Sequence, residues 1–227
     1  MNSQPTPLLC ITTLFLLLLT TTHTSSADPE PLQDFCVADL QSTTTINGKF
    51  PTGFPCKPAS QVTSDDFFFS GFTNEANTSS NDFGSFVTPG NVEAFPGLNT
   101  LGISMNRVDI APGGINPPHH HPRASEAGVV VQGQVLVGFV TTAGVYHSRV
   151  LAASEMFVIP RGLVHFQLNV GIEKAILITS FNSQLPGSVV APLALFAAEP
   201  SVPDRVLAKS FLVGEDVVRS IKAKFIR

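Results

Sequence analysis

The sequence predicts an all-β domain, a sandwich or barrel built from many short strands. From Gly97 onward, short alternating or β-branched apolar runs are separated by Gly and Pro, which is typical of such folds. Charged residues make up only 13% of the 227 residues and hydrophobic residues 43%, which argues against disorder and for a buried sheet. The net charge is −4 and no basic segment stands out, so we expect neither nucleic acid nor an anionic membrane as a partner.

The expected strands follow one another with short connections. They cover residues 101–110, 126–132, 135–141, 145–151, 156–159, 164–170 and 175–181. The C-terminal part differs, because Val217 or Val218, Ile221 and Phe225 recur at helical spacing after Gly214. We therefore expect C-terminal helices whose apolar stripe covers either this domain or a neighbouring subunit.

The first 27 residues are predicted to be a secretory signal peptide. The apolar run from Leu8 to Leu19 has about twelve residues, whereas crossing a bilayer takes about twenty. Small residues end this segment, and cleavage is expected near Ala27. A buried N-terminal helix is the alternative, and Pro5 and Pro7 disfavour it. We therefore expect a secreted protein without a membrane span.

An irregular arm over residues 28–60 is expected to follow the signal peptide. After cleavage, Cys36 and Cys56 remain as an even pair, which indicates a disulfide in an oxidising compartment. Two free thiols that serve a metal are the alternative, although neither cysteine lies near a histidine motif. Asn77 opens an Asn-Thr-Ser sequon, so it is a candidate glycosylation site in a secreted protein.

The segment Gly113 to Glu126, GGINPPHHHPRASE, contains three histidines and a carboxylate within eight residues. If the run is extended, His119 and His121 point to one face and His120 to the other. A kink or bulge is expected just after them at Pro122, and it would bring Glu126 toward the same point.

His165 is the predicted fourth ligand. It shares a strand face with Gln167 and Asn169, opposite an apolar face. Three imidazoles and one carboxylate suit a borderline or hard divalent ion, and the spacing alone would accept manganese, iron, nickel, copper or zinc. The alternative interpretation is a solvated histidine patch and an unrelated core histidine.

These motifs resemble those of the cupin superfamily. The pattern joins a Gly-x5-His-x-His-x4-Glu-x6-Gly motif at Gly113 to a Pro-x-Gly-x2-His-x3-Asn motif at Pro160, and the phrases QDFCVAD and MFVIPRGLVHFQLN resemble plant germins and germin-like proteins. One departure is Ser154, where the family usually has Gly.

The resemblance implies a cupin jelly-roll β-barrel over residues 61–200, a disulfide-tied N-terminal arm and a C-terminal helical segment over 201–227. It further implies Mn²⁺ as cofactor, a Cys36–Cys56 disulfide, a homohexamer arranged as a trimer of dimers, and a place in the apoplast or cell-wall matrix.

For activity, the resemblance implies production of hydrogen peroxide by superoxide dismutation, with a role in defence. Oxidation of oxalate is the alternative, with Asn106 and Asn116 at the positions that hold substrate in germins with that activity. A third possibility is a non-enzymatic cell-wall component or a receptor for a small acid. No side chain beyond the metal site is expected to be catalytic.

Overall fold

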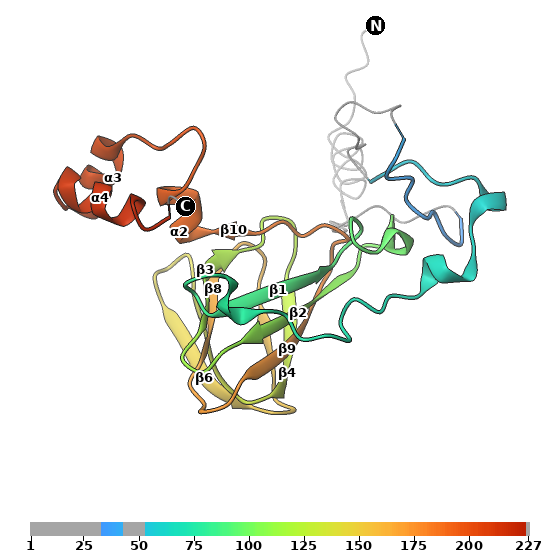
Figure 1. The fold of residues 1–227 in the computed structure, drawn as a ribbon, viewed down its shortest axis with the longest axis horizontal. Helices are drawn as coiled ribbons and strands as arrows, with labels where there is room; N and C mark the ends of the chain where they lie inside the picture. Colours follow the sequence, from blue (N-terminus) through green and yellow to red (C-terminus); the bar gives the residue numbers. More distant parts are fainter. Residues whose placement is uncertain (1–32, 43–52, 226–227) are drawn as a thin grey trace, which may run out of the picture.

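The fold is a sandwich of two five-stranded antiparallel sheets, seen in a computed structural model that describes residues 33–42 and 53–225. One sheet has the order β1-β2-β9-β4-β7 and the other β10-β3-β8-β5-β6 (Figure 1). The strands are β1 (Ser85–Gly90), β2 (Ser104–Ile110), β3 (Ile115–His120), β4 (Glu126–Gln132), β5 (Gln134–Val140), β6 (Tyr146–Ala152), β7 (Met156–Ile159), β8 (Val164–Asn169), β9 (Ala175–Phe181) and β10 (Val189–Val190). The predicted all-β sandwich class is confirmed.

The helical elements lie outside this sandwich. Within the part of the chain that the structure describes, four short 3-10 helices are η2 (Ala59–Gln61), η3 (Ser64–Phe67), η4 (Thr78–Ser80) and η5 (Pro96–Leu98). Three α-helices end the chain: α2 (Ala191–Phe196), α3 (Asp204–Phe211) and α4 (Glu215–Lys222). The predicted signal peptide over residues 1–27 lies outside the described residues.

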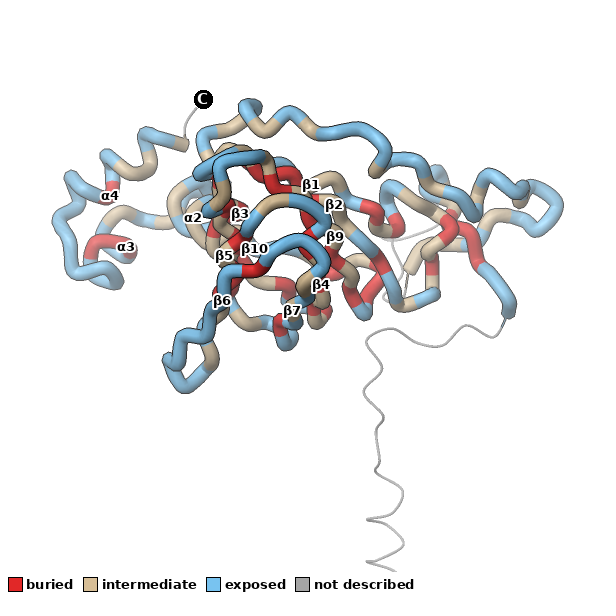
Figure 2. The backbone as a smooth tube through the Cα atoms, turned by 90° about the horizontal axis from the view of Figure 1, so that it is seen from below, coloured by how far each residue is buried: buried red, intermediate tan, exposed pale blue. Residues whose placement is uncertain are grey.

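The apolar core fills the space between the sheets at one end of the sandwich. Along β4, β8 and β9, alternate residues point inward, so buried positions recur with a period of two (Figure 2). Both sheets contribute to the core cluster: Val108, Ile110, Val130, Val135, Val137, Leu151, Ile159, Ala175 and Leu177. On β8, however, the inward residues are His165, Gln167 and Asn169, so this strand turns its polar face to the interior.

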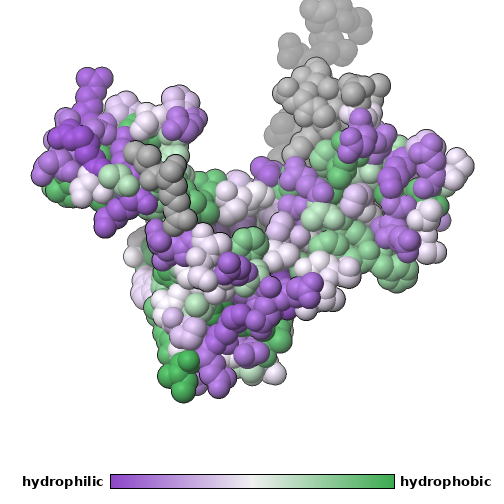
Figure 3. Space-filling model, in the orientation of Figure 1, coloured by the Kyte–Doolittle hydropathy of each residue, from purple (hydrophilic) through white to green (hydrophobic). Residues whose placement is uncertain are grey.

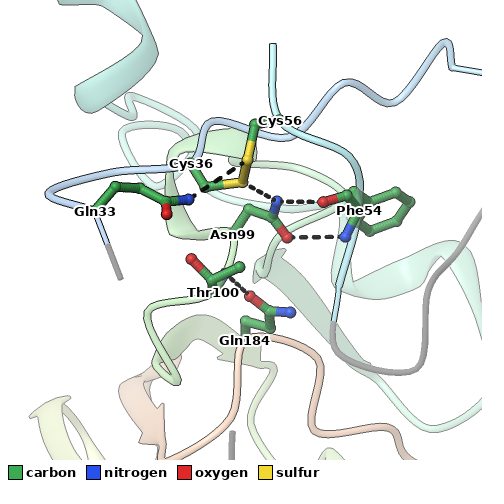
Figure 4. Close-up of a disulfide and its surroundings, with 7 residues drawn as sticks. All are labelled: Gln33, Cys36, Phe54, Cys56, Asn99, Thr100 and Gln184. Carbon is green, nitrogen blue, oxygen red and sulfur yellow. Dashed lines mark hydrogen bonds between the residues drawn. A yellow bond between two sulfur atoms is a disulfide. The ribbon is translucent and has the colours of Figure 1, made fainter. Parts of the chain in front are cut away.

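The predicted disulfide closes the N-terminal arm on itself, and Asn99 contacts it. Cys36 and Cys56 are bonded, and Asn99 lies beside them (Figure 4). The Asn99 amide donates to Phe54 O at 2.8 Å and to Cys36 Sγ at 3.3 Å, and its oxygen accepts from Phe54 N at 3.0 Å. Asn99 is fully buried, so its amide supplies the backbone of the arm with hydrogen bonds that water would otherwise make.

The C-terminal helices form a small unit of their own. Leu207 and Val218 are buried between α3 and α4, and Lys222 makes a 2.8 Å ion pair with Asp204 that lowers the pKa of that carboxyl. Figure 1 shows α3 and α4 projecting away from the sheets, and Figure 3 shows hydrophobic surface among hydrophilic surface on them. Of the two valines proposed for the helical stripe, Val218 is buried and Val217 is 42% exposed.

The turn before β7 keeps a left-handed residue although it lacks the family's glycine. Ser154 has φ 73°, and its N–H donates to Val130 O at 2.8 Å. This conformation costs an L-residue roughly 1–2 kcal/mol, so the hydrogen bond and the neighbouring strands hold the turn in place.

Candidate metal centre

The predicted ligands His119 and His165 face each other across β3 and β8. The ladder pairs His119 with His165 and Asn116 with Gln167, so β3 has one more residue than β8 between these two rungs. The extra residue lies in the Pro117–Pro118 pair and makes a β-bulge. Asn116 and His119 therefore both point inward, although regular alternation would put residues three apart on opposite faces.

Glu126 reaches the same point from the opposite sheet. A turn at 122–123 follows His121, as Pro122 suggested, and it carries the chain from β3 to β4. Glu126 begins β4, and its Oε2 lies 3.0 Å from Nε2 of both His121 and His165. The carboxylate thus meets the imidazoles across the sandwich and does not swing back along their own strand.

The four side chains form one buried cluster. Their ligand atoms all lie within 4.8 Å of one another, and the cluster consists of His119, His121, Glu126 and His165. The three histidines are only 4%, 6% and 1% exposed, respectively, so the alternative of a solvated patch fails for these residues. His120 stands outside the cluster and pairs with Val189 of β10.

Backbone carbonyls fix the tautomer of each histidine in the cluster. Nδ1 of His119 lies 2.8 Å from Pro117 O, Nδ1 of His121 lies 2.6 Å from Gly187 O, and Nδ1 of His165 lies 2.9 Å from Leu163 O. A carbonyl oxygen can only accept, so each Nδ1 carries the hydrogen and each Nε2 keeps its lone pair in the neutral ring. All three lone pairs are available for a metal ion.

The electrostatics of the cluster favour a bound cation. Burial, followed by the neighbouring His165, lowers the pKa of His119 to about 3, so this ring stays neutral near pH 7. Burial alone would raise the pKa of Glu126, but the facing His121 and His165 outweigh it and lower the pKa to about 2. Three imidazole nitrogens and one carboxylate oxygen lie within 4.8 Å of one another, and a divalent cation can take the place of the hydrogens between them. The residues therefore fit a divalent ion.

A cavity of about 200 Å³ lies beside the cluster. Both asparagines predicted from the germin resemblance line it: Asn106 from β2 and Asn116 from β3. Phe181 closes part of the wall and packs its ring 4.7 Å from that of His121. The cavity is large enough for a small anion such as superoxide or oxalate to lie next to the cluster.

Gln167 is a site residue that the sequence did not identify. Its side chain is fully buried, accepts from Asn116 Nδ2 at 2.7 Å and donates to Glu126 Oε1 at 3.4 Å. Its position two residues after His165, on the same strand face, was visible in the sequence. Its partners were not, because they depend on the register between β3 and β8.

The candidate glycosylation residue Asn77 lies on the surface and does not belong to the metal cluster. It is exposed at the start of η4, where its side chain accepts from Ser79 N at 3.0 Å and from Ser79 Oγ at 2.8 Å.

Within the described residues, no helix has both the length and the apolar character needed to cross a bilayer.

Comparisons with known proteins agree on the family of the chain. The cupin family model matches residues 50–219. The chain is 54% identical over 224 residues to Germin-like protein 3-7 of Oryza sativa subsp. japonica, covering 99% of this chain and 94% of that one. It is 58% identical over 200 residues to Germin-like protein subfamily T member 2 of Arabidopsis thaliana, covering 88% and 87%. A solved oxalate oxidase in complex with the substrate analogue glycolate is 51% identical, with a TM-score of 0.83 over 87% of this chain and 98% of that one.

Proposed function

This chain belongs to the germin-like proteins of the cupin family, and from that premise we propose that it is a manganese-dependent oxidoreductase that converts superoxide to hydrogen peroxide. The observation that carries the proposal is the convergence of three imidazoles and one carboxylate on a single buried point. Nitrogen and oxygen donors without a thiolate suit manganese, and four protein ligands leave positions open on an ion that prefers six.

The residues of the cluster have distinct roles in this proposal. His119, His121 and His165 would bind through Nε2, because their Nδ1 hydrogens are held by carbonyls. Glu126 would bind through Oε2 and neutralise one of the two positive charges. With Mn²⁺ bound, the site would keep a net positive charge, which would attract a small anion into the adjacent cavity. Manganese bound here would supply the one-electron exchange by which two superoxide ions and two protons become one peroxide and one dioxygen.

A direct experiment tests both the metal and the substrate. Protein purified from its natural source is analysed for metal content, and the same sample is assayed for superoxide consumption and for oxalate-dependent peroxide. We expect about one manganese per chain and superoxide consumption that disappears in His165→Ala. A manganese-loaded sample that converts neither substrate would contradict the enzymatic proposal and favour a binding or structural role in the cell wall.

Oxalate oxidation is the second candidate function. Asn106 and Asn116 line the cavity beside the cluster, where their amides could donate to a carboxylate. The solved relative with 51% identity is an oxalate oxidase that binds glycolate. In this reaction one oxalate, one dioxygen and two protons give two carbon dioxide and one peroxide. Peroxide formation that requires oxalate, in the same assay, would select this candidate.

We further propose that the protein is secreted into the apoplast, is glycosylated at Asn77 and acts in defence through peroxide. The disulfide and the exposed sequon support an extracellular location. A mass decrease after enzymatic deglycosylation, absent in Asn77→Gln, tests the modification.

A homohexamer, arranged as a trimer of dimers, is the proposed assembly. The projecting helices expose apolar side chains that need a partner surface, among them Phe211 at 49% and Leu212 at 85% exposure. Light scattering after size-exclusion chromatography measures the mass directly, and a monomer of 24.1 kDa or less would contradict the proposal.

A further inference from the structure

Gln167 connects the cavity wall to the carboxylate of the metal cluster. Asn116 lies opposite Gln167 on the β3–β8 ladder, and both side chains point inward. Asn116 Nδ2 donates to Gln167 Oε1 at 2.7 Å, and Gln167 Nε2 faces Glu126 Oε1 at 3.4 Å. Three buried side chains from three strands thus form one hydrogen-bonded row.

The first bond of this row sets the direction of the second. A glutamine amide has one oxygen and one NH₂ group, so acceptance from Asn116 turns the NH₂ group of Gln167 toward Glu126. The two oxygens of Glu126 then have separate partners. Oε1 faces Gln167, whereas Oε2 faces the histidines His121 and His165 at 3.0 Å.

We propose that Asn116 is a positioning residue for Glu126 and acts through Gln167. Asn116 keeps the Gln167 amide in the orientation that donates to Oε1, and this donation holds the carboxylate so that Oε2 alone points to the ion. The proposal rests on the proposed metal site, but it requires no turnover. It gives Asn116 a role in metal binding in addition to any contact with substrate.

Asn106 provides a matched control for this role. It lines the same cavity from β2, on the other sheet, and carries the same amide. The hydrogen bond that Gln167 accepts comes from Asn116, so Asn106 stands outside this row. A residue that only holds substrate should affect substrate binding alone, whereas Asn116 should also affect the affinity for the ion.

The experiment measures the affinity of the metal-free protein for Mn²⁺ alone, in the absence of substrate. Loss of an outer partner of a metal ligand typically lowers metal affinity about 10- to 100-fold, and we expect this for Gln167→Leu. Asn116→Ala should lower the affinity by about tenfold, while Asn106→Ala leaves it at the wild-type value. The double variant should bind no more weakly than Gln167→Leu, because the effect of Asn116 passes through Gln167.

A second readout separates positioning from a general loss of stability. The electron paramagnetic resonance spectrum of bound Mn²⁺ should change in Asn116→Ala and Gln167→Leu and stay unchanged in Asn106→Ala. Asn169→Ala removes another buried amide from the same face of β8, one that donates to Ile110 O and Glu173 O, and it should lower stability without changing the spectrum.

Two outcomes would overturn the proposal. One is a wild-type affinity and spectrum in Asn116→Ala, and the other is an affinity loss in the double variant equal to the product of the single losses. Both measurements are independent of activity. A protein that converts neither superoxide nor oxalate would therefore overturn the proposed function and leave this inference to be decided by metal binding.

Discussion

Asn116 and His119 point to the same interior although they lie three residues apart on one strand. The bulge at Pro117–Pro118 adds one residue to β3 relative to β8 and restores the inward direction. Proline suits this place, because a residue that donates no backbone hydrogen bond loses nothing where the ladder is interrupted. The residue count between the two side chains therefore decides which groups reach the metal cluster.

Deletion of Pro118 should abolish most metal binding, whereas Pro118→Ala should retain it. The deletion restores regular alternation, so either His119 leaves the cluster or Asn116 leaves Gln167. We expect Mn²⁺ affinity to fall by at least about tenfold in the deletion variant, measured by titration of the metal-free protein. The alanine variant keeps the residue count and should bind close to wild type. Similar losses in both variants would show that the proline rings, and not the count, matter.

His165→Ala should lose most of its bound metal, while His120→Ala keeps it. Nε2 of His165 lies within the cluster, whereas His120 belongs to the other face of β3 and stands outside it. Elemental analysis of the two purified variants, with circular dichroism to verify folding, checks this difference. Equal metal losses in the two variants would mean that His120 also contributes to the metal site, against its position outside the cluster.

The sequence predicted the strands well because one face of most of them packs against the core. The alternation in Ala175–Phe181, for example, matches the alternation of burial along β9. Strand β1 lacks that signal because it contains Pro89 and Gly90, and β10 has only two residues. Such edge segments become strands because they pair with a neighbouring strand, and their own composition does not predict it.

The candidate site was predictable to the level of residue types and local facing. A period of two predicted that His119 and His121 could share a point, and His165 was predicted as a further ligand from the polar face of its own strand. It could not show that Glu126 comes from the opposite sheet. The turn at 122–123 leads from β3 to β4, and the sheet that β4 joins is decided by strand pairing between distant parts of the chain. The role of Gln167 likewise depends on cross-strand register, which the sequence does not specify.

The metal-free protein should lose stability as the pH falls from about 6.5 toward 2. The pKa of His119 is about 3 in the folded protein and 6.5 ordinarily, so below 6.5 the unfolded chain binds a proton that the folded chain does not. Glu126 acts in the same direction between 4.5 and about 2, because its carboxylate stays ionised in the folded protein. Urea unfolding at stepped pH measures the slope.

Two variants assign this acid dependence to its sources. His119→Gln should flatten the slope between pH 6.5 and 3, and Glu126→Gln should flatten it between 4.5 and 2, since neither amide titrates. An unchanged slope in both variants would place the acid sensitivity elsewhere in the protein.

Ser154→Gly should stabilise the protein. Ser154 has φ 73°, a conformation that glycine adopts without the steric cost of a Cβ atom. The gain should be about 1 kcal/mol or less, which corresponds to a rise in Tm of up to about 4 °C for a domain of this size. Ser148→Gly in the middle of β6 is the control and should lower Tm, because glycine is unfavourable inside a strand. A lower Tm for both variants would show that the Ser154 side chain itself supports the turn.

Removal of the disulfide in Cys36→Ala/Cys56→Ala should lower the free energy of unfolding by about 3 kcal/mol, because the bond constrains a loop of 20 residues in the unfolded chain. Asn99→Ala should cost about 1–3 kcal/mol on its own, since it removes the two buried hydrogen bonds that Asn99 makes with Phe54 N and O. Urea unfolding of the two variants and their combination measures both terms. If the cysteine variant loses less than about 1 kcal/mol, the arm is held chiefly by Asn99 and its backbone contacts, and the disulfide only secures a segment already docked.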